Sequence, residues 1–339
     1  MPERIRSRAG FRETVRGIGA PPGPTMTVRG LNFCLTGLKP PDFIYICTMK
    51  KLTILLASAT ACLTLGAASP KPEASATLGA ATPKPEIPAI LDIAYSSLND
   101  GFHINTMEHF KAAVKAGFNC LKADMQTTSD GVVVLCHDVG FTFDTDGRIG
   151  KFDKKNHTLI CEMTYRDVKK LEYAFADPVS GKHPKVCTLD RFAAYCAKAK
   201  VWMYPTQRND RMVDRTQAEL RRILKKYGMT RRCIVNNYPY SLETGAKVHA
   251  YLPMVPVCYT LDYYDHFNKA LLDRISGDLP AMVCLNRAWV DKIDSDTIRY
   301  AEDKGIRVLG WYPHTSQEYA RWKDLGLTGA QITKIEVIR

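Results

Sequence analysis

Two pairs of polar residues in this chain could do chemistry together. Lys122 and Asp124 stand two positions apart in a short predicted strand, and a histidine and an aspartate, His137 and Asp138, follow an apolar run. Side chains at i and i+2 of a strand share a face, about 6.6 Å apart at the backbone, so the ammonium of Lys122 can reach Asp124. An imidazole can move protons, and an ammonium can hold negative charge. The two pairs therefore predict a polar site suited to an anionic ligand.

Four local elements would position these residues. Asn105 is expected to cap a helix, with Glu108 reaching back as a capping box, and Gly117 supplies the left-handed exit. The strand that carries Lys122 follows, and a turn of Thr, Ser, Asp and Gly over residues 127–131 leads to the apolar run 132–136. A continuous apolar run is typical of a buried strand, and a polar pair at its end is frequent at the sites of α/β barrels.

The order of these residues resembles the glycerophosphodiester phosphodiesterase family. The matching positions are Asn105-Thr106, Asp124, Thr128, Asp130-Gly131 and His137-Asp138. Three later segments match as well: Thr188-Leu189, residues 305–311 and residues 325–333. The resemblance runs from about Ile90 to the C-terminus, and it implies an α/β fold, a (β/α)8 TIM barrel in a single domain over residues 88–339.

The rest of the chain alternates strand and helix patterns, as such a barrel requires. Short apolar runs predict strands at residues 201–204, 233–236, 255–259, 281–285 and 308–311. Helices are expected between or after them at residues 217–227, 241–250, 294–304 and 316–325.

The resemblance also implies chemistry that this chain carries only in part. The family uses two histidines as general acid and base, an arginine on the phosphate, and usually a calcium or magnesium ion held by carboxylates. The first histidine falls on Tyr95, the arginine on Ser96, and the glutamates on Ile104 and Lys122; the later Glu-x-Lys pair falls on Tyr204 and Thr206. Only Asp124, His137 and Asp138 keep the family residue, with Trp311 as an expected wall of the pocket.

The lysine at position 122 decides the expected metal chemistry. An ammonium in the metal's first shell repels the cation and pairs with the carboxylate that would have bound it. We therefore expect no cofactor and no metal, with Asp124 as the one ligand if any, and Lys122 as the local positive charge. In the alternative interpretation, Lys122 extends to solvent without a role. Likewise, His137 could simply be hydrogen-bonded locally at a strand end.

These assignments lead to two main hypotheses and a third class. The expected catalytic residues are His137, Lys122 and Asp124, and the expected substrate-binding residues are Tyr95, Ser96, Asp138, Tyr204 and Trp311. In the first hypothesis the protein binds a small phosphodiester or polyol-like ligand with little or no turnover, as a pseudoenzyme. In the second it is a metal-independent phosphoric diester hydrolase of lipid metabolism, acting through His137 and Lys122. A glycan-acting barrel is the third class, although no acid pair is identified for it.

The N-terminal part predicts an exported protein. Residues 49–68 combine Met-Lys-Lys, an apolar stretch too short to span a bilayer, and small residues before Ser69, which is the pattern of a secretory signal peptide. Residues 1–48 are then an upstream extension, from a mis-assigned start or a disordered leader, and residues 69–87 are a Pro-, Ala- and Ser-rich linker. We expect a periplasmic or extracellular location without a transmembrane span. A lipid anchor at Cys62 is the less favoured alternative.

Net charge indicates which kinds of ligand the chain can bind, and the positions of the cysteines indicate whether they form disulfides. The formal net charge is +12, but the leader carries seven Lys or Arg against three Asp or Glu and the signal adds two lysines, so the mature chain keeps +6. This suits an anionic ligand and gives no argument for nucleic acid, since no basic stripe with interleaved aromatic residues occurs. Eight of the eleven cysteines lie in the mature part, several in expected core strands, and we expect most to be free thiols. The oligomeric state stays open.

Overall fold

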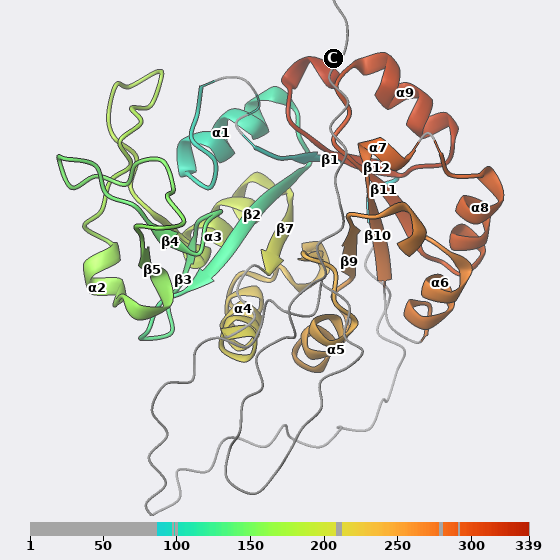
Figure 1. Ribbon diagram of the computed structural model, residues 1–339, viewed down its shortest axis with the longest axis horizontal. Helices are drawn as coiled ribbons and strands as arrows, with labels where there is room; N and C mark the ends of the chain where they lie inside the picture. Colours follow the sequence, from blue (N-terminus) through green and yellow to red (C-terminus); the bar gives the residue numbers. More distant parts are fainter. Residues whose placement is uncertain are drawn as a thin grey trace, which may run out of the picture. The chain divides into compact units, whose positions relative to one another are not determined.

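The computed structural model describes residues 87–96, 98, 101–207, 212–277, 281–290 and 292–338 (Figure 1). The predicted leader, signal peptide, residue Cys62 and nearly all of the linker lie outside these residues. Within them, no helix is both long enough and apolar enough to cross a lipid bilayer.

Eight parallel strands close into a barrel, which confirms the expected (β/α)8 fold. The first strand pairs with the last one on one side and with the second barrel strand on the other, so the sheet has no open edge within the barrel. In barrel order the strands are β1 (Leu91–Ala94), β2 (Cys120–Thr127), β7 (Trp202–Gln207), β8 (Val235–Asn237), β9 (Val257–Leu261), β10 (Ala281–Asn286), β11 (Arg307–Trp311) and β12 (Gly329–Ile332).

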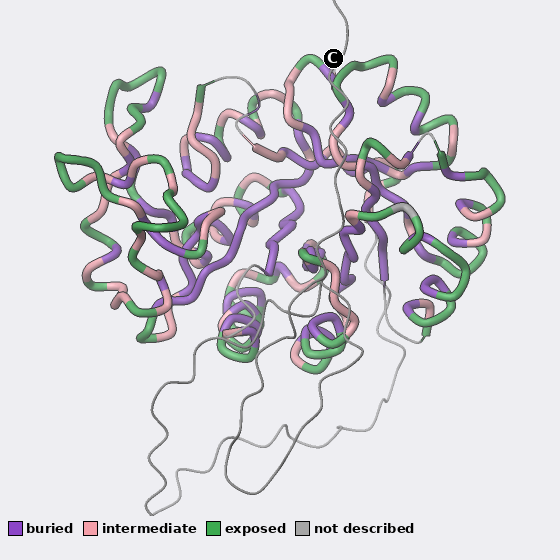
Figure 2. Tube along the Cα trace, viewed as in Figure 1, coloured by how far each residue is buried: buried purple, intermediate pink, exposed green. Residues whose placement is uncertain are grey.

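Helices connect the barrel strands and cover the barrel from outside (Figure 1). They are α1 (Met107–Ala116), α3 (Leu189–Ala199), α4 (Val213–Tyr227), α5 (Leu242–Tyr251), α6 (Lys269–Ile275), α7 (Arg287–Val290), α8 (Ser295–Asp303) and α9 (Ser316–Asp324). Each longer helix buries one apolar stripe against the strands and leaves its other face in water, which Figure 2 shows as purple turned inward and green turned outward. Phe110, Phe192 and Trp322 are fully buried in this layer.

The barrel interior changes from apolar to polar along the strands. A buried cluster inside the barrel includes Cys120, Trp202, Cys258 and Leu309. Because side chains on one face of a strand repeat every second residue, the next inward positions are Lys122, Tyr204, Thr260 and Trp311. The strands therefore end, at their carboxyl ends, in a polar and aromatic mouth.

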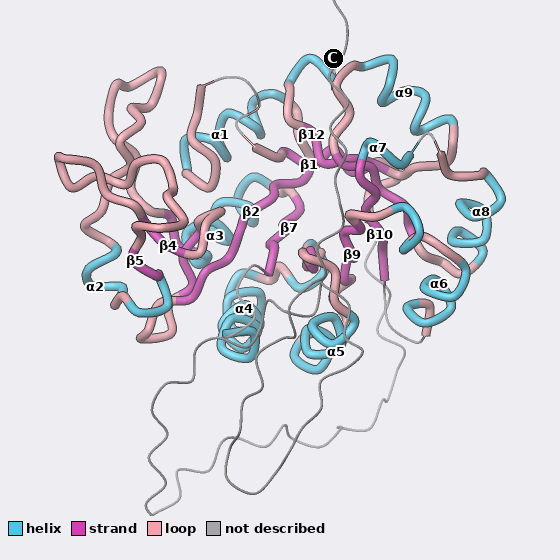
Figure 3. The backbone as a smooth tube through the Cα atoms, in the orientation of Figure 1, coloured by secondary structure: helices cyan, strands magenta, loops and turns pink. Residues whose placement is uncertain are grey.

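A loop-rich excursion, residues 128–186, leaves the barrel after β2 (Figure 3). Its elements are β3 (Val133–Leu135), β4 (Gly140–Phe141), β5 (Thr158–Leu159) and α2 (Tyr165–Val168), and the chain returns through β6 (Cys187–Thr188). The apolar run 132–136 does form a buried strand, but β3 pairs antiparallel with β2 and is not one of the eight barrel strands. The cause is the short turn before it, because a parallel neighbour needs a crossover of a dozen or more residues.

Most other expectations agree with the structure. The strands predicted from apolar runs at residues 201–204 and 308–311 are β7 and β11, and the helices expected at 294–304 and 316–325 are α8 and α9. All eight cysteines of the described part are free thiols, as expected. The cap of α1 was assigned wrongly: Thr106, not Asn105, is the N-cap, and its hydroxyl accepts a hydrogen bond from the backbone N–H of His109 at 3.3 Å.

Candidate functional site

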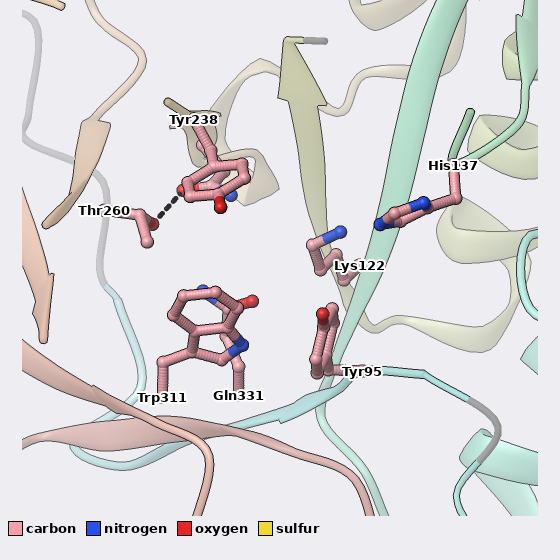
Figure 4. A pocket seen from close by; sticks show the side chains of 8 residues that line it. Tyr95, Lys122, His137, Tyr238, Thr260, Trp311 and Gln331 are labelled. Atoms are coloured by element: carbon pink, nitrogen blue, oxygen red, sulfur yellow. Dashed lines mark hydrogen bonds between the residues drawn. The ribbon is translucent and has the colours of Figure 1, made fainter. Parts of the chain in front are cut away.

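A cavity of about 270 Å³ lies at the polar mouth of the barrel (Figure 4). It is smaller than a site for a drug-sized molecule, so it suits a small ligand. Most of its lining side chains lie on barrel strands or directly after them, and one comes from the excursion: Tyr95, Lys122, His137, Asn236, Tyr238, Thr260, Trp311 and Gln331.

Lys122 carries the positive charge of this cavity. Its Nζ donates a hydrogen bond to Oδ1 of Asp124 at 2.5 Å, and both side chains are almost fully buried. The ammonium also lies over the ring of Tyr95, 4.9 Å from the ring centroid, which adds a cation–π attraction. Lys122 therefore does not extend to solvent; it points into the cavity, paired with the carboxylate two residues along the same strand.

Asn105 holds the other side of Asp124. The side-chain oxygen of Asn105 accepts a hydrogen bond from the backbone N–H of Asp124 at 2.9 Å, and this bond fixes the orientation of the side-chain amide. The amide nitrogen must then face the carboxylate, and it donates to Oδ2 of Asp124 at 3.1 Å. Asn105 adopts this position with a φ of 61°, in the left-handed region that asparagine tolerates better than most residues.

The donors around Asp124 do not fit the divalent metal that the family resemblance implies. A calcium or magnesium ion needs several oxygen lone pairs directed at one point. Both oxygens of Asp124 instead accept hydrogen bonds from nitrogen donors, one of them a charged ammonium. Among the residues that the structure describes, no three His, Cys, Asp or Glu side chains come together as a possible metal site.

His137 enters the cavity from the excursion and not from a barrel strand. It follows β3, and in Figure 4 its ring points toward the ammonium of Lys122. Its Nδ1 lies 3.1 Å from Oδ1 of Asp138, and the imidazole is about 38% exposed. Asp138 thus contacts the histidine rather than the cavity, where it can orient the ring and select its tautomer.

Aromatic rings wall one side of the cavity. The ring of Trp311 packs edge-on against Tyr95, with centroids 6.1 Å apart, and against Tyr238, with centroids 5.6 Å apart. Trp311 and Tyr95 thus lie where the sequence placed them, in the pocket. Tyr238 was missed because the sequence analysis assigned no site residue to the strand before it or to the segment that follows.

A hydrogen-bonded layer forms the floor. The amide oxygen of Asn236 accepts from the hydroxyls of Thr260 at 2.7 Å and Tyr204 at 3.2 Å, and its nitrogen donates to Thr206 at 3.1 Å. Tyr204 is fully buried beneath the cavity and does not line it, so it supports Asn236 from below. Sequence reasoning missed Asn236, Thr260 and the cavity role of Gln331, although continuing the every-second-residue pattern along each strand would have found them.

A second, much smaller compartment of about 10 Å³ adjoins the main cavity and shares Tyr95 and Lys122 with it. The expected site residues Ser96 and Asp124 line this compartment rather than the main cavity, together with Ile104, Asn105 and His109. His103 takes no part in either space. It stacks on Tyr173 in the excursion, with ring centroids 4.1 Å apart.

The architecture and this mouth define a class of protein: an α/β barrel with a polar cavity at the carboxyl ends of its strands, where barrel enzymes carry their active sites. The model of the glycerophosphoryl diester phosphodiesterase family matches residues 98–335, and the chain belongs to this family.

Solved structures share the barrel. A glycerophosphodiester phosphodiesterase from Agrobacterium tumefaciens is 14% identical, with a TM-score of 0.57 over 73% of this chain and 98% of that one. An Oleispira antarctica phosphodiesterase in complex with the product sn-glycerol-3-phosphate is 14% identical, with a TM-score of 0.60 over 73% and 95%. A Thermotoga maritima glycerophosphodiester phosphodiesterase is 16% identical, with a TM-score of 0.55 over 74% and 96%. At these identities the likeness concerns the fold alone. No curated protein sequence matches the chain.

Proposed function

We propose that this protein binds a small phosphodiester, or a closely related phosphate-bearing ligand, without a metal ion and with little or no turnover. The observation that carries the proposal is the ammonium of Lys122, fixed 2.5 Å from Asp124 inside the cavity. It supplies one positive charge at the place where the family resemblance implies an inorganic cation. An ammonium has three N–H donors, so besides the bond to Asp124 it can donate a charge-assisted hydrogen bond to a phosphate oxygen, and such bonds are strong in a site shielded from water.

The size and lining of the cavity support a small, partly polar ligand. Amides and hydroxyls of Asn236, Thr260 and Gln331 can bond to ligand oxygens, while Tyr238 and Trp311 can cover carbon atoms. The Oleispira phosphodiesterase holds sn-glycerol-3-phosphate, and a ligand of that kind combines a phosphate with polar hydroxyls. We therefore choose sn-glycerol-3-phosphate and intact glycerophosphodiesters as the ligands to test.

Metal-independent hydrolysis is the second candidate, favoured by the presence of His137 and Lys122 on the same cavity. In that reaction a water oxygen would form a bond to phosphorus while the bond to the leaving alkoxide breaks. Lys122 would neutralise the phosphoryl oxygens. His137, oriented by Asp138, would give the alkoxide its proton and then take up the proton that the attacking water loses. Glycan hydrolysis is less well supported, because the two carboxylates nearest the cavity, Asp124 and Asp138, are both engaged with neighbouring residues.

We also propose that the chain is exported, on the strength of the signal-like sequence at residues 49–68 and the spacer that follows it. A lipid anchor at Cys62 remains the less favoured form of this proposal. An exported member of this family would meet phosphodiesters released from lipids.

Calorimetric titration tests the proposed binding. The mature chain would be titrated with sn-glycerol-3-phosphate and with glycerophosphodiesters in the presence of a chelator. We expect Lys122→Met to lower the affinity by about tenfold or more, since one charge-assisted hydrogen bond is lost. Lys115→Met, at an exposed lysine of α1, is the matched control and should leave the affinity unchanged. Hydrolysis of a diester with chelator present would replace the binding proposal with the second candidate, and equal affinities of wild type and Lys122→Met would overturn both.

A further inference from the structure

His109 is a buried histidine that neither the sequence pattern nor the main cavity accounts for. It lies near the start of α1, and only 1% of its surface is exposed. Neither ring nitrogen makes a hydrogen bond of ordinary geometry with any residue that the structure describes. Buried polar atoms of this kind are nearly always bonded to protein or to an ordered water, because leaving them unpaired costs free energy.

The small compartment beside Lys122 gives this imidazole a partner. His109 lines it together with Ser96, Asn105, Lys122 and Asp124. Its volume, about 10 Å³, is close to what a single water molecule needs, and a water in such a place requires two to four polar partners. The lining offers an ammonium donor, a carboxylate and an imidazole, so both conditions are met.

We propose that this compartment is a single-water site, and that His109 acts through the bound water as a positioning residue for the ammonium of Lys122. The inference rests on the proposed role of Lys122 as the charge that receives the ligand. The water donates one hydrogen to a ring nitrogen of His109 and accepts one N–H of Lys122. Asp124 takes another N–H of the same ammonium, so the two acceptors together fix the direction of the lysine side chain.

The charge state of His109 agrees with this role. Burial, the nearby ring of His103 and the positive charge of Lys122 lower its pKa to about 4, although the backbone of Ser96 opposes the shift. The imidazole is therefore neutral at neutral pH and keeps one nitrogen as a hydrogen-bond acceptor. A protonated ring would instead repel the ammonium and could not accept a bond from the water.

Two variants distinguish a hydrogen-bond acceptor role of His109 from a role in packing alone. His109→Leu keeps an apolar side chain in the space and removes the acceptor, while His109→Gln keeps a polar acceptor. The readouts are the pH dependence of Lys122 modification by a small amine-reactive reagent, followed by mass spectrometry, and the affinity for sn-glycerol-3-phosphate in chelator.

We expect His109→Leu to lower the apparent pKa of Lys122 and to weaken the affinity by about fivefold, and His109→Gln to restore most of both. A crystal structure of the wild type should contain one ordered water between His109 and Lys122. An empty compartment in that crystal structure, or an unchanged Lys122 titration in His109→Leu, would overturn the inference. If His109→Leu does not fold, the ordered water of the wild type and the His109→Gln variant still decide it. A wild type that ignores sn-glycerol-3-phosphate while Lys122 still responds to His109→Leu would refute the proposed function alone.

Discussion

At the scale of single residues, the site is organised around one ammonium and the carboxylate beside it. Lys122 and Asp124 are both buried, and each is costly to bury alone. They stabilise the fold only as a pair, because desolvation of either charge is offset by the other and by Asn105. The same arrangement that secures the pair also removes both oxygens of Asp124 from metal coordination.

A double-mutant cycle should measure this pairing. Asp124→Asn leaves the Lys122 ammonium buried without its counter-charge, so we expect the free energy of unfolding to fall by about 3 kcal/mol. The double variant Asp124→Asn with Lys122→Met removes both charges and should lose markedly less than Asp124→Asn and Lys122→Met lose together. Urea unfolding curves give each value, and additive losses would mean that the two side chains are independent.

Acid should weaken the fold through His109. Its folded-state pKa of about 4 lies below the 6.5 of an unperturbed histidine, so between these values the unfolded chain binds a proton that the folded chain does not. Stability is therefore fully present above pH 6.5 and falls as the pH drops toward 4, by at most about 3 kcal/mol from this residue. His249, with its pKa also lowered by burial to about 4, adds to the same window.

Comparing unfolding curves at pH 7 and pH 4.5 for wild type, His109→Gln and His249→Gln checks this assignment. Each single variant should lose less stability on acidification than the wild type. If His109→Gln and the wild type lost the same amount, His109 would have to be charged or exposed in the folded protein.

Part of this site could be predicted from the sequence. Lys122, His137, Tyr95 and Trp311 could be placed in one pocket because they follow a recognisable order along the chain. The role of Asn105 could not be foreseen, because its bond partner Asp124 lies 19 residues further along the chain, beyond α1, and the bond depends on a left-handed backbone that sequence does not reveal. Its neighbour Thr106 is also one of the preferred capping residue types.

At the scale of elements, the register of the barrel strands brings the site residues together at the mouth of the barrel. Most barrel strands place apolar residues in the interior first and polar or aromatic residues further along, so the mouth is polar and aromatic. Apolar runs and helical spacing located most of these elements to within a few residues. The apolar run 132–136 predicted a buried strand but not its direction, because an apolar run looks the same in a parallel and an antiparallel neighbour. The short turn before it is the feature that makes β3 antiparallel to β2.

Gly310 in β11 shows how tightly the outer layer packs on the barrel. A Cβ atom added there would clash with Cζ3 and Cε3 of the indole of Trp322 from α9. Gly310→Ala should therefore lower the free energy of unfolding by about 1–3 kcal/mol through overpacking. Gly277, after α6, has open space around it, and Gly277→Ala should change stability little. Thermal denaturation of the two variants tests the comparison, and similar midpoints for both would contradict the described contact between Gly310 and Trp322.

At the scale of the whole molecule, the closed barrel followed from the ordered match to one family, which set the strand sequence and thus the topology. Composition alone would have allowed other α/β folds, since alternating strands and helices do not specify closure. The N-terminal predictions concern residues 1–87, of which residues 1–86 lie outside the described part of the chain, and they stay predictions.

Expression from Met49 in a bacterial host with a C-terminal tag tests the proposed export. The N-terminal sequence of the recovered protein should start near Ser69, and the protein should be found outside the cytoplasm. A lipid-modified N-terminus at Cys62 would instead support the anchored form. Protein that keeps residues 49–68 and stays in the cytoplasm would refute export.

We expect the ammonium of Lys122 to exclude the divalent cation that the family resemblance implies, and a calcium titration of wild type beside Lys122→Glu decides whether it does. In Lys122→Glu the repelling charge is gone and a second carboxylate faces Asp124, so this variant should release heat on binding calcium, while the wild type should give none. Calcium binding by the wild type with Asp124 as a ligand, abolished by Asp124→Asn, would contradict the account.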